Sequence, residues 1–309
     1  MFASSDYHRK RNILDFIFFL RPMLHPPVWT VVILGYSRSP VRNDSPYMLI
    51  WLLLLSSAAA GWAYIANQIT DIESDRVNQK LFFLPNDLIS MRSAYILATI
   101  LGLATIIGAF FLSMTLGILF TIGIGMGYIY SGKPFFGKDR PFISALLNGA
   151  AHGLMPFLAG YVGAGGGFVQ GLIRALPYLF AVVAVFVGTT IPDIDGDMRI
   201  GKRTPGVALG LQYSTVVMTL SLMTALLLSL ILWDIPLIIA ANLSLPFYLA
   251  ATIRPTIRKS LVAIKISILL LSITACVRFW PYSILLLILF GGTHLYYRLR
   301  FDMAYPRLT

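Results

Sequence analysis

Long apolar segments alternate with short polar ones along most of the chain. About 20 consecutive apolar residues carry a helix across the hydrocarbon core of a bilayer. Runs near that length predict ten spanning helices, over residues 24–36, 46–66, 91–112, 114–131, 141–162, 174–191, 212–232, 235–253, 261–279 and 282–298. Because the runs are continuous, they favour helices over barrel strands. Only Trp280 and Pro281 separate the last two runs, so nine spans, the last of them broken, remain an alternative.

Composition agrees with a protein that lies almost wholly in the membrane. Hydrophobic residues make up 57% of the chain and charged residues 12%, and the mean hydropathy is +0.77. These values lie far from those of an average soluble domain. We therefore expect an all-α, polytopic bundle of nine or ten transmembrane helices, with residues 1–309 forming a single transmembrane domain.

Lys and Arg indicate the orientation, since short cytoplasmic loops are enriched in them. With ten spans, both termini lie on one side, and of the 24 Lys and Arg only Arg38, Arg42, Arg174 and Arg278 lie on the other. The termini are therefore predicted to be cytoplasmic. Topology and attraction to anionic lipid account for the net charge of +11. We expect membrane lipid as a partner and no nucleic acid.

Acidic residues gather in two short stretches. Of thirteen Asp and Glu, six lie in "NQITDIESD" (67–75) and in "PDIDGDMRIGKRT" (192–204). The first stretch ends the second predicted span and the second ends the sixth, so both fall on the cytoplasmic side. Their separation by four spans suggests an internal duplication of a four-helix unit.

Spacing within each stretch places several of these side chains on one helix face. Asn67, Asp71 and Asp75 are spaced i, i+4, i+8, and Asp193 and Asp197 repeat the i, i+4 interval. A helix advances by about 100° per residue, so an acid two positions away points about 200° from its neighbours. Glu73 and Asp195 should therefore face elsewhere.

Like charges at i, i+4 repel one another, and the repulsion grows near hydrocarbon. A bound cation would compensate for it. Hard oxygen ligands suit Mg²⁺, which typically takes one or two carboxylates, several waters and substrate phosphate oxygens. Two facing acid clusters therefore predict Mg²⁺ ions that hold a diphosphate, whereas a solvated helix end is the simpler interpretation of either stretch alone.

Basic residues near the acids fit diphosphate binding, either as point charges or as bidentate forks. Each is also explained by the ordinary enrichment of Lys and Arg in cytoplasmic loops. The candidates on the same side are Arg76, Lys80, Lys133, Lys138, Arg140, Arg199, Lys202 and Arg203.

Together, "NQITDIESD" and "DIDGDMRIGKRT" resemble the paired aspartate-rich motifs of the UbiA superfamily of intramembrane prenyltransferases. Tyr130 and Ser131 before a basic loop are also similar to that family. The resemblance implies a bundle around a central cavity whose cytoplasmic end binds Mg²⁺ and diphosphate. It implies catalytic and metal-binding roles for Asp71, Asp75, Asp193 and Asp197, with Asn67 as a further metal ligand. The implied diphosphate-binding residues are Asn67, Arg76, Lys80, Tyr130, Lys133, Lys138, Lys202 and Arg203.

Three features depart from the family pattern. Gln68 stands where the family usually has an aspartate, so one carboxylate is missing. The segment "KLFFLPNDLIS" (80–90) lacks the usual basic-Pro pair and glycine. Ten spans exceed the usual nine.

The expected activity is Mg²⁺-dependent transfer of a prenyl group from a polyprenyl diphosphate to an aromatic or lipid-like acceptor, with release of diphosphate. Metal and basic side chains would neutralise the departing charge, and the membrane-embedded cavity would keep water from the allylic cation. Aromatic faces can stabilise such a cation, although core packing is the commoner role. The candidates are Tyr64, Tyr128, Tyr130, Phe157 and Tyr161.

Two alternatives remain open. A terpene cyclase on the same scaffold would let the cation attack its own chain, without an external acceptor. A secondary transporter would use the acids as cation sites, but transporter sites tend to lie near the bilayer midplane in broken helices, whereas these acids lie at helix ends. The sequence assigns no general base.

Overall fold

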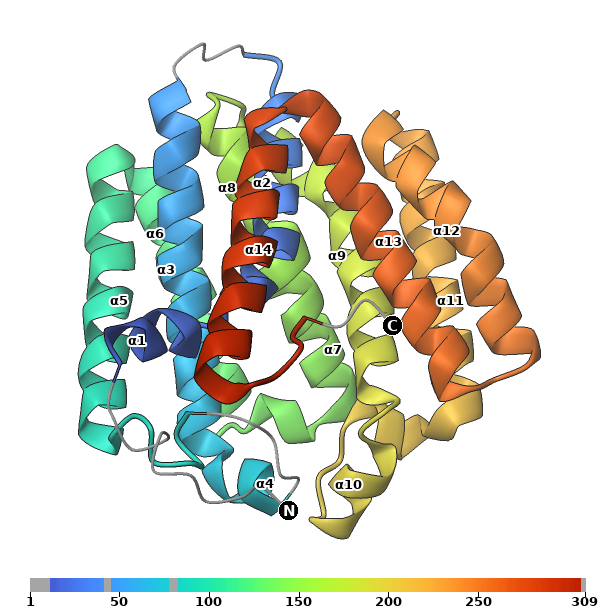
Figure 1. The fold of residues 1–309 in the computed structure, drawn as a ribbon. Helices are drawn as coiled ribbons and strands as arrows, with labels where there is room; N and C mark the ends of the chain where they lie inside the picture. The colour runs from blue at the N-terminus through green and yellow to red at the C-terminus, as the bar shows by residue number, and fades with distance from the viewer. Residues whose placement is uncertain (1–11, 42–45, 78–82, 307–309) are drawn as a thin grey trace.

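A computed structural model describes residues 12–41, 46–77 and 83–306 (Figure 1). Its helices are α1 (Ile13–Phe19), η2 (Pro22–Leu24), α2 (His25–Arg38), α3 (Pro46–Thr70), α4 (Ile72–Val77), α5 (Met91–Leu112), α6 (Met114–Ser131), η3 (Gly137–Asp139), α7 (Pro141–Gly149), η4 (Ala150–Leu154), α8 (Met155–Gly163), α9 (Phe168–Thr190), α10 (Ile194–Arg199), α11 (Pro205–Ile231), α12 (Ile235–Ile253), α13 (Ile257–Arg278) and α14 (Pro281–Phe301). The long helices stand side by side as a bundle, while α1 runs across them in this view.

The predicted helical membrane bundle is confirmed. Over the described ranges, nine segments have the length and apolarity to cross a membrane, the first being Ile13–Arg38, which joins α1, η2 and α2. The predicted runs 261–279 and 282–298 form two separate helices, α13 and α14, rather than one broken helix. At about 1.5 Å per residue, the 21 residues of α14 reach about 31 Å, but His294, Arg298 and Arg300 lower the apolarity of its second half.

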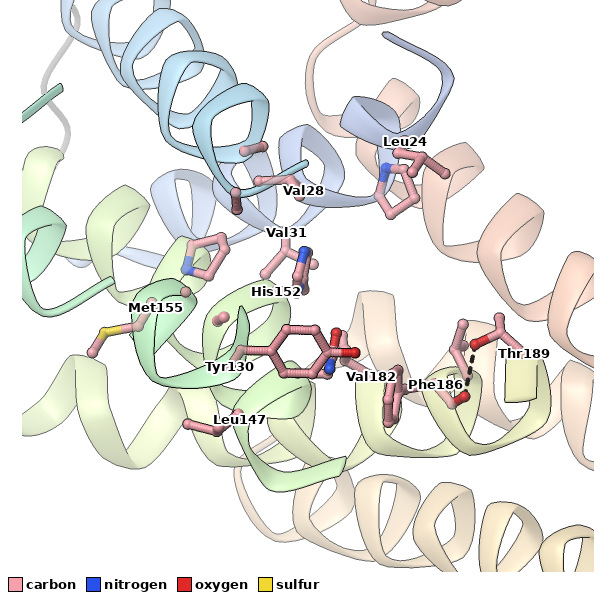
Figure 2. Close-up of a pocket in the computed structure, with 18 of the residues that line it drawn as sticks. Leu24, Val28, Val31, Tyr130, Leu147, His152, Met155, Val182, Phe186 and Thr189 are labelled. Atoms are coloured by element: carbon pink, nitrogen blue, oxygen red, sulfur yellow. Dashed lines mark hydrogen bonds between the residues drawn. The ribbon is translucent and has the colours of Figure 1, made fainter. Parts of the chain in front are cut away.

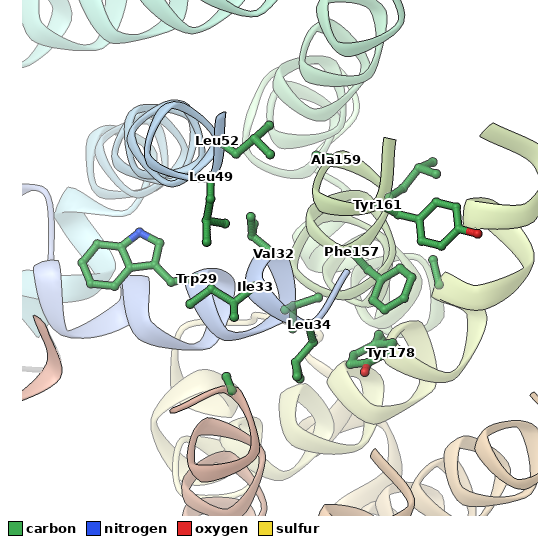
Figure 3. Close-up of a cluster of buried hydrophobic side chains, with 14 of the residues drawn as sticks. Trp29, Val32, Ile33, Leu34, Leu49, Leu52, Phe157, Ala159, Tyr161 and Tyr178 are labelled. Atoms are coloured by element: carbon green, nitrogen blue, oxygen red, sulfur yellow. The ribbon is translucent and has the colours of Figure 1, made fainter. Parts of the chain in front are cut away.

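Helix α2 is the most deeply buried of the long helices, and the largest hydrophobic cluster forms around it (Figure 3). Val32, Ile33 and Leu34 pack there with Phe157 of α8 and Tyr178 of α9. Two glycines let α2 and α8 approach closely. A Cβ atom on Gly35 would lie 2.1 Å from the Phe157 carbonyl oxygen, and one on Gly160 would lie 2.2 Å from that of Val32.

The outer surface of the bundle is apolar. Phe111 is 86% exposed and Leu287 74% exposed, and exposed side chains of this kind occur along most of the long helices. Such a surface suits lipid rather than water. The protein is therefore an integral, multi-pass membrane protein.

Both acid stretches occupy the same end of the bundle. Helix α3 is followed by the six-residue helix α4, and α9 by the six-residue helix α10. Figure 1 shows α4 and α10 at the lower end of the bundle, beyond the long helices. This arrangement brings two sequence-distant acid stretches to one place, and the duplication of a four-helix unit stays a prediction.

An ionic cluster joins the first helix to the last. Asp15 is 1% exposed and accepts hydrogen bonds from the Tyr296 hydroxyl at 2.7 Å and from both Nε and Nη2 of Arg300 at 3.1 Å. The bidentate pair fixes α1 against α14. The side chains of this cluster bond to one another and do not border the cavity described below.

Candidate active site

A cavity of about 610 Å³ lies within the bundle. Its inner walls are apolar, with side chains from α2, α6, α9 and α12, and Figure 2 shows Val28 and Val31 facing Val182 and Phe186 across it. Tyr130 and His152 point into the space between them. At the acid end, Asn67, Asp71, Asp193, Asp197 and Lys202 border the same cavity. The cavity therefore joins a charged mouth to an apolar interior.

The first acid stretch keeps the helical spacing that the sequence predicts. Asp71 lies between α3 and α4, yet its amide donates to the Asn67 carbonyl at 3.0 Å, and the Asp75 amide donates to the Asp71 carbonyl at 2.8 Å. Asn67 and Asp71 border the cavity, whereas Asp75 is buried at 5% exposure and does not border it. Glu73 is exposed, as its position on the opposite face predicts.

The second acid stretch has matching geometry. The Asp197 amide donates to the Asp193 carbonyl at 2.8 Å, and the Asp197 side chain accepts a hydrogen bond from the Thr204 hydroxyl at 3.0 Å. Both aspartates border the cavity, and Asp195 is exposed. Thr204 belongs to the "GKRT" tail, so this tail folds back onto the acid that precedes it.

Two lysines connect the acid stretches. Asp71 Oδ1 lies 2.8 Å from Lys138 Nζ and 3.0 Å from Lys202 Nζ. Lys138 comes from the segment before α7, and Lys202 lies near the end of the second acid stretch, so three distant segments meet at one carboxylate. Burial raises the pKa of the Asp71 carboxyl, but the charges and hydrogen bonds of the two lysines outweigh burial and leave that pKa below its usual range. Asp71 is therefore held in its ionised form.

Other predicted basic residues lie away from the cavity. Arg76 is exposed, donates to the Pro85 carbonyl at 3.2 Å and lies 3.9 Å from Asp87. Lys133 and Arg203 are also exposed and do not border the cavity. Lys80 lies outside the described residues. Of the predicted diphosphate-binding set, the structure thus brings Asn67, Tyr130, Lys138 and Lys202 together.

Gln68 does not replace a site carboxylate in space. It is 1% exposed, and its side-chain amide donates to the carbonyls of Phe19 at 3.1 Å and Tyr64 at 3.2 Å. The bond to Phe19 ties α3 to the end of α1, and the bond to Tyr64 lies within α3. The departure from the family pattern therefore faces a helix contact and not the cavity.

The predicted aromatic set divides between cavity and core. Tyr64 and Tyr130 border the cavity, whereas Phe157 and Tyr161 belong to the buried cluster and Tyr128 is exposed. His152 lies in the π-helical turn η4 and stacks on Tyr64, with the ring centroids 6.3 Å apart. The cavity thus has aromatic faces near its charged end.

The oxygen-rich donor set fits a hard divalent cation. Within the described ranges, no group of three or more His, Cys, Asp or Glu forms a ready-made metal cage. Mg²⁺ commonly binds without such a cage, through one or two carboxylates together with water and phosphate oxygens. Asn67, Asp71, Asp193 and Asp197 supply oxygens of this kind around one cavity mouth.

Sequence reasoning missed two charged residues at the mouth, Arg21 and Asp139. Arg21 precedes η2 with φ of 54°, a left-handed conformation that directs the chain from α1 into α2. Asp139 directly follows Lys138, and its loop position gave no periodic signal. In the sequence, only its position next to Lys138 could have indicated a place at the site.

Comparison with known proteins identifies the family. Residues 28–273 match the UbiA prenyltransferase family. Among curated proteins, the chain is 26% identical to digeranylgeranylglyceryl phosphate synthase of Sulfurisphaera tokodaii, over 59% of this chain and 64% of that protein. It is 27% identical to homogentisate phytyltransferase of Synechocystis, over 67% of this chain and 70% of that protein. The match to the first relative thus spans just under two thirds of that relative's length.

Solved structures show the same fold. The UbiA homolog from Archaeoglobus fulgidus bound to GPP and Mg²⁺ has a TM-score of 0.69 and 17% identity, covering 85% of this chain and 99% of that one. The apo UbiA homolog from Aeropyrum pernix K1 has a TM-score of 0.65 and 17% identity, covering 86% and 97%. These likenesses extend the similarity over most of the helical bundle.

Proposed function

This chain belongs to the UbiA prenyltransferase family, and on that premise we propose that it is a Mg²⁺-dependent intramembrane prenyltransferase. It transfers a prenyl group from a polyprenyl diphosphate to an aromatic or lipid-like acceptor and releases diphosphate. One observation carries the proposal: carboxylates of two distant stretches and two lysines meet at the mouth of a cavity whose interior is apolar.

The mouth suits the diphosphate group. Asn67, Asp71, Asp193 and Asp197 would hold Mg²⁺, and Asp75, buried behind them, is proposed as a supporting acid. Mg²⁺, when bound, neutralises the charge that develops on the leaving diphosphate. Lys138 and Lys202 lie where their ammonium groups can bind diphosphate oxygens as point charges. The proposed roles of Arg76, Lys133 and Arg203, which do not border the cavity, would be secondary, and the proposed role of Lys80 rests on the sequence alone.

The apolar interior suits the prenyl chain. The carbon–oxygen bond to the diphosphate breaks with its electron pair leaving on oxygen, and the acceptor donates an electron pair to the allylic carbon and loses a proton. The walls of α2 and α9 exclude water from this carbon, which would otherwise capture it. The Tyr64 and Tyr130 rings border the same space and offer π faces to a cation.

Relatives support the substrate classes. One relative is named for a glyceryl phosphate lipid and another for homogentisate, an aromatic acid. Structural neighbours were solved with GPP or DMAPP and Mg²⁺. Prenyl diphosphates and Mg²⁺ are therefore the first compounds to test with this chain.

Orientation belongs to the same proposal. We infer from the distribution of Lys and Arg that both termini and the acid end of the cavity face the cytoplasm. Attaching a cysteine-reactive, membrane-impermeant label to an introduced cysteine at exposed Asp195 tests this. Labelling from the outside of intact cells would overturn the orientation.

The activity is tested directly with purified protein in detergent. The protein is incubated with Mg²⁺ and a series of allylic diphosphates, with and without aromatic and lipid-like acceptors, and diphosphate release and products are measured by mass spectrometry. Acceptor-dependent release supports transfer. Release with an acceptor-free hydrocarbon product would instead establish the cyclase alternative, and absence of release with every donor would refute the proposal.

A further inference from the structure

His152 is a titratable residue of the cavity wall that binding of the diphosphate leaves without a role. The proposed transfer produces one proton for each new bond, because the acceptor loses it when its electron pair joins the allylic carbon. The carboxylates that border the cavity lie at its charged mouth. In an interior that excludes water, either the leaving diphosphate or a side chain of the wall must take this proton.

The residues that border the cavity offer few bases for this step. Apart from the charged residues of the mouth, three titratable side chains among the described residues border it, those of Tyr64, Tyr130 and His152. A neutral tyrosine does not hold an added proton near neutral pH, whereas a neutral imidazole has a lone pair that does. His152 is therefore the base that this part of the wall supplies.

The ring of His152 is open to the cavity. The residue lies in the π-helical turn η4, a kind of turn that often occurs at functional sites. It is half-buried, and Figure 2 shows its ring pointing into the cavity. One ring nitrogen is hydrogen-bonded to the Asn148 carbonyl, one turn earlier. Since a neutral imidazole has one N–H and one lone pair, donation to Asn148 leaves the other nitrogen able to accept a proton.

Helix α3 shows how deep this ring lies. The His152 ring stacks on the Tyr64 ring, with the centroids 6.3 Å apart. Asn67, the first residue of the first acid stretch, follows Tyr64 by three residues on α3, and both border the cavity. Three helical residues rise by about 4.5 Å. The ring thus lies about one turn inside the mouth, the level at which the first carbon of a bound prenyl diphosphate would lie.

Helix α7 leads to the same level from the other side. Asp71 and Asp197 act electrostatically on the Tyr130 hydroxyl, and the Asn148 side chain is hydrogen-bonded to that hydroxyl. His152 follows Asn148 by four residues, one turn further from the mouth. Two separate elements therefore place His152 just beyond the charged groups and beside the apolar interior.

We propose that His152 is the general base of the transfer. This inference rests on the proposed function and adds a catalytic residue to it. The allylic carbon–oxygen bond breaks with its electron pair on the diphosphate, and an electron pair from the acceptor hydroxyl or ring forms the new bond to that carbon. The acceptor proton goes to the ring nitrogen of His152 that faces the cavity. The imidazolium then gives this proton to the departing diphosphate, which restores the neutral ring.

The test separates proton removal from donor binding. The full chain in detergent receives Mg²⁺, geranyl diphosphate and one of two acceptors, hydroquinone or a hexadecyl glycerol phosphate, and the single-turnover rate of transfer is measured by mass spectrometry. Thermal stabilisation by Mg²⁺ at fixed geranyl diphosphate, the Mg²⁺ response, is measured alongside by tryptophan fluorescence. The variants are His152→Gln and His152→Ala.

His25→Gln is the matched control. His25 also packs against Tyr64, with the ring centroids 5.7 Å apart, but it does not border the cavity. Its Nε2 lies 2.9 Å from the Leu20 carbonyl oxygen, and a glutamine amide can donate to the same oxygen. This variant should transfer at the rate of the unmodified protein.

For His152→Gln we expect transfer to slow by about 100-fold, the contribution typical of a general base. Its Mg²⁺ response should stay unchanged, because the mouth is intact. His152→Ala should lose as much, and added imidazole should restore part of the rate in this variant by taking the place of the missing ring. A residue that only packs against Tyr64 would show no such rescue.

The outcomes distinguish this inference from the proposed function. If His152→Gln transfers as fast as the unmodified protein, His152 is not the base and a diphosphate oxygen takes the proton. Loss of transfer without rescue of His152→Ala by imidazole would also overturn the inference. If the unmodified protein transfers to neither acceptor, the proposed function fails first and the inference falls with it. Should His152→Gln not fold, imidazole rescue of His152→Ala alone decides.

Discussion

Buried aspartates lie at both ends of the bundle, and their surroundings differ. At the end opposite the acid stretches, Asp234 Oδ1 accepts hydrogen bonds from the Tyr178 hydroxyl at 3.1 Å and the Leu237 amide at 3.2 Å, and Oδ2 lies 3.7 Å from Arg38 Nε. At the acid end, Asp71, Asp193 and Asp197 border a cavity, and Asp75 is buried behind them without bordering it.

The contrast separates carboxylates that hold the fold together from those that border the cavity. Asp234 caps α12 and fastens it to α9 through Tyr178, so protein groups use its hydrogen-bonding capacity. Asp15 resembles it, since Tyr296 and Arg300 bind that carboxylate. Burial alone therefore does not mark a functional acid. A place at the cavity mouth does.

The largest expected effect is on the acid that both lysines contact. Asp71→Ala should lower diphosphate release from an allylic diphosphate by about 1,000-fold, or about 4 kcal/mol, because a metal ligand at the leaving group is lost. Release is measured with a coupled phosphate assay after pyrophosphatase treatment. Glu73→Ala, two residues along and exposed, serves as the control. Activity within threefold of normal in Asp71→Ala would contradict the site.

At the opposite end the effect should be on stability. Asp234→Ala should lower the free energy of unfolding by about 3 kcal/mol, because it leaves the Tyr178 hydroxyl and the Leu237 amide without their acceptor and removes the ion-pair partner of Arg38. Denaturant unfolding in detergent measures this. The stabilisation of this variant by Mg²⁺ in the presence of an allylic diphosphate should stay normal. If a folded Asp234→Ala protein were stabilised less by Mg²⁺ and the diphosphate, the proposed difference between the two ends of the bundle would be contradicted.

Asp234→Asn should lower the free energy of unfolding by less than Asp234→Ala does, since an amide oxygen can accept the same two hydrogen bonds from Tyr178 and Leu237. Burial raises the pKa of Asp234, and the Leu237 amide and Arg38 offset that effect only in part. The folded protein therefore binds this proton more readily than the unfolded chain. The stability of the unmodified protein relative to Asp234→Asn should rise as pH falls through the folded pKa toward about 4, near the unfolded value. An opposite slope would contradict the raised pKa.

A smaller effect is expected for Lys202→Gln. Lys202 lies 3.0 Å from Asp71 Oδ1 and would compete with a metal ion for that oxygen. Mg²⁺ alone should therefore bind this variant somewhat more tightly. Diphosphate should bind about 10-fold more weakly, a loss of about 1.4 kcal/mol, because one positive charge is missing. Titration calorimetry with Mg²⁺ and with pyrophosphate separates the two effects, and equal changes for both ligands would argue against competition.

The smallest effects should come from the outward-facing acids. Glu73→Gln and Asp195→Asn remove exposed charges within the same stretches as the site acids. Each should change the free energy of unfolding by less than about 0.5 kcal/mol and leave the Mg²⁺ response unchanged. A large loss of Mg²⁺ binding in either variant would show that helix face does not decide which acids serve the site.

Prediction from the sequence succeeded where the cause is local. The run 91–112 matches α5, 114–131 matches α6 and 235–253 matches α12 at both ends, because a chain in lipid must satisfy its backbone hydrogen bonds within each helix. The i, i+4 interval likewise distinguished Asp71 and Asp197 from exposed Glu73 and Asp195. The same interval did not predict that Asp75 would be buried behind the cavity mouth.

The sequence by itself determined the membrane helices, the position of both acid stretches at helix ends and the faces on which their acids lie. Only the tertiary structure decided which loop residues reach the site: Lys138 and Lys202 contact Asp71, whereas Lys133 and Arg203 stay exposed. It also turned Gln68 toward Phe19 and brought Asp139 to the cavity. Helical periodicity follows from short-range backbone bonding, but the direction of a loop side chain depends on how distant helices pack, and no repeat in the sequence encodes that.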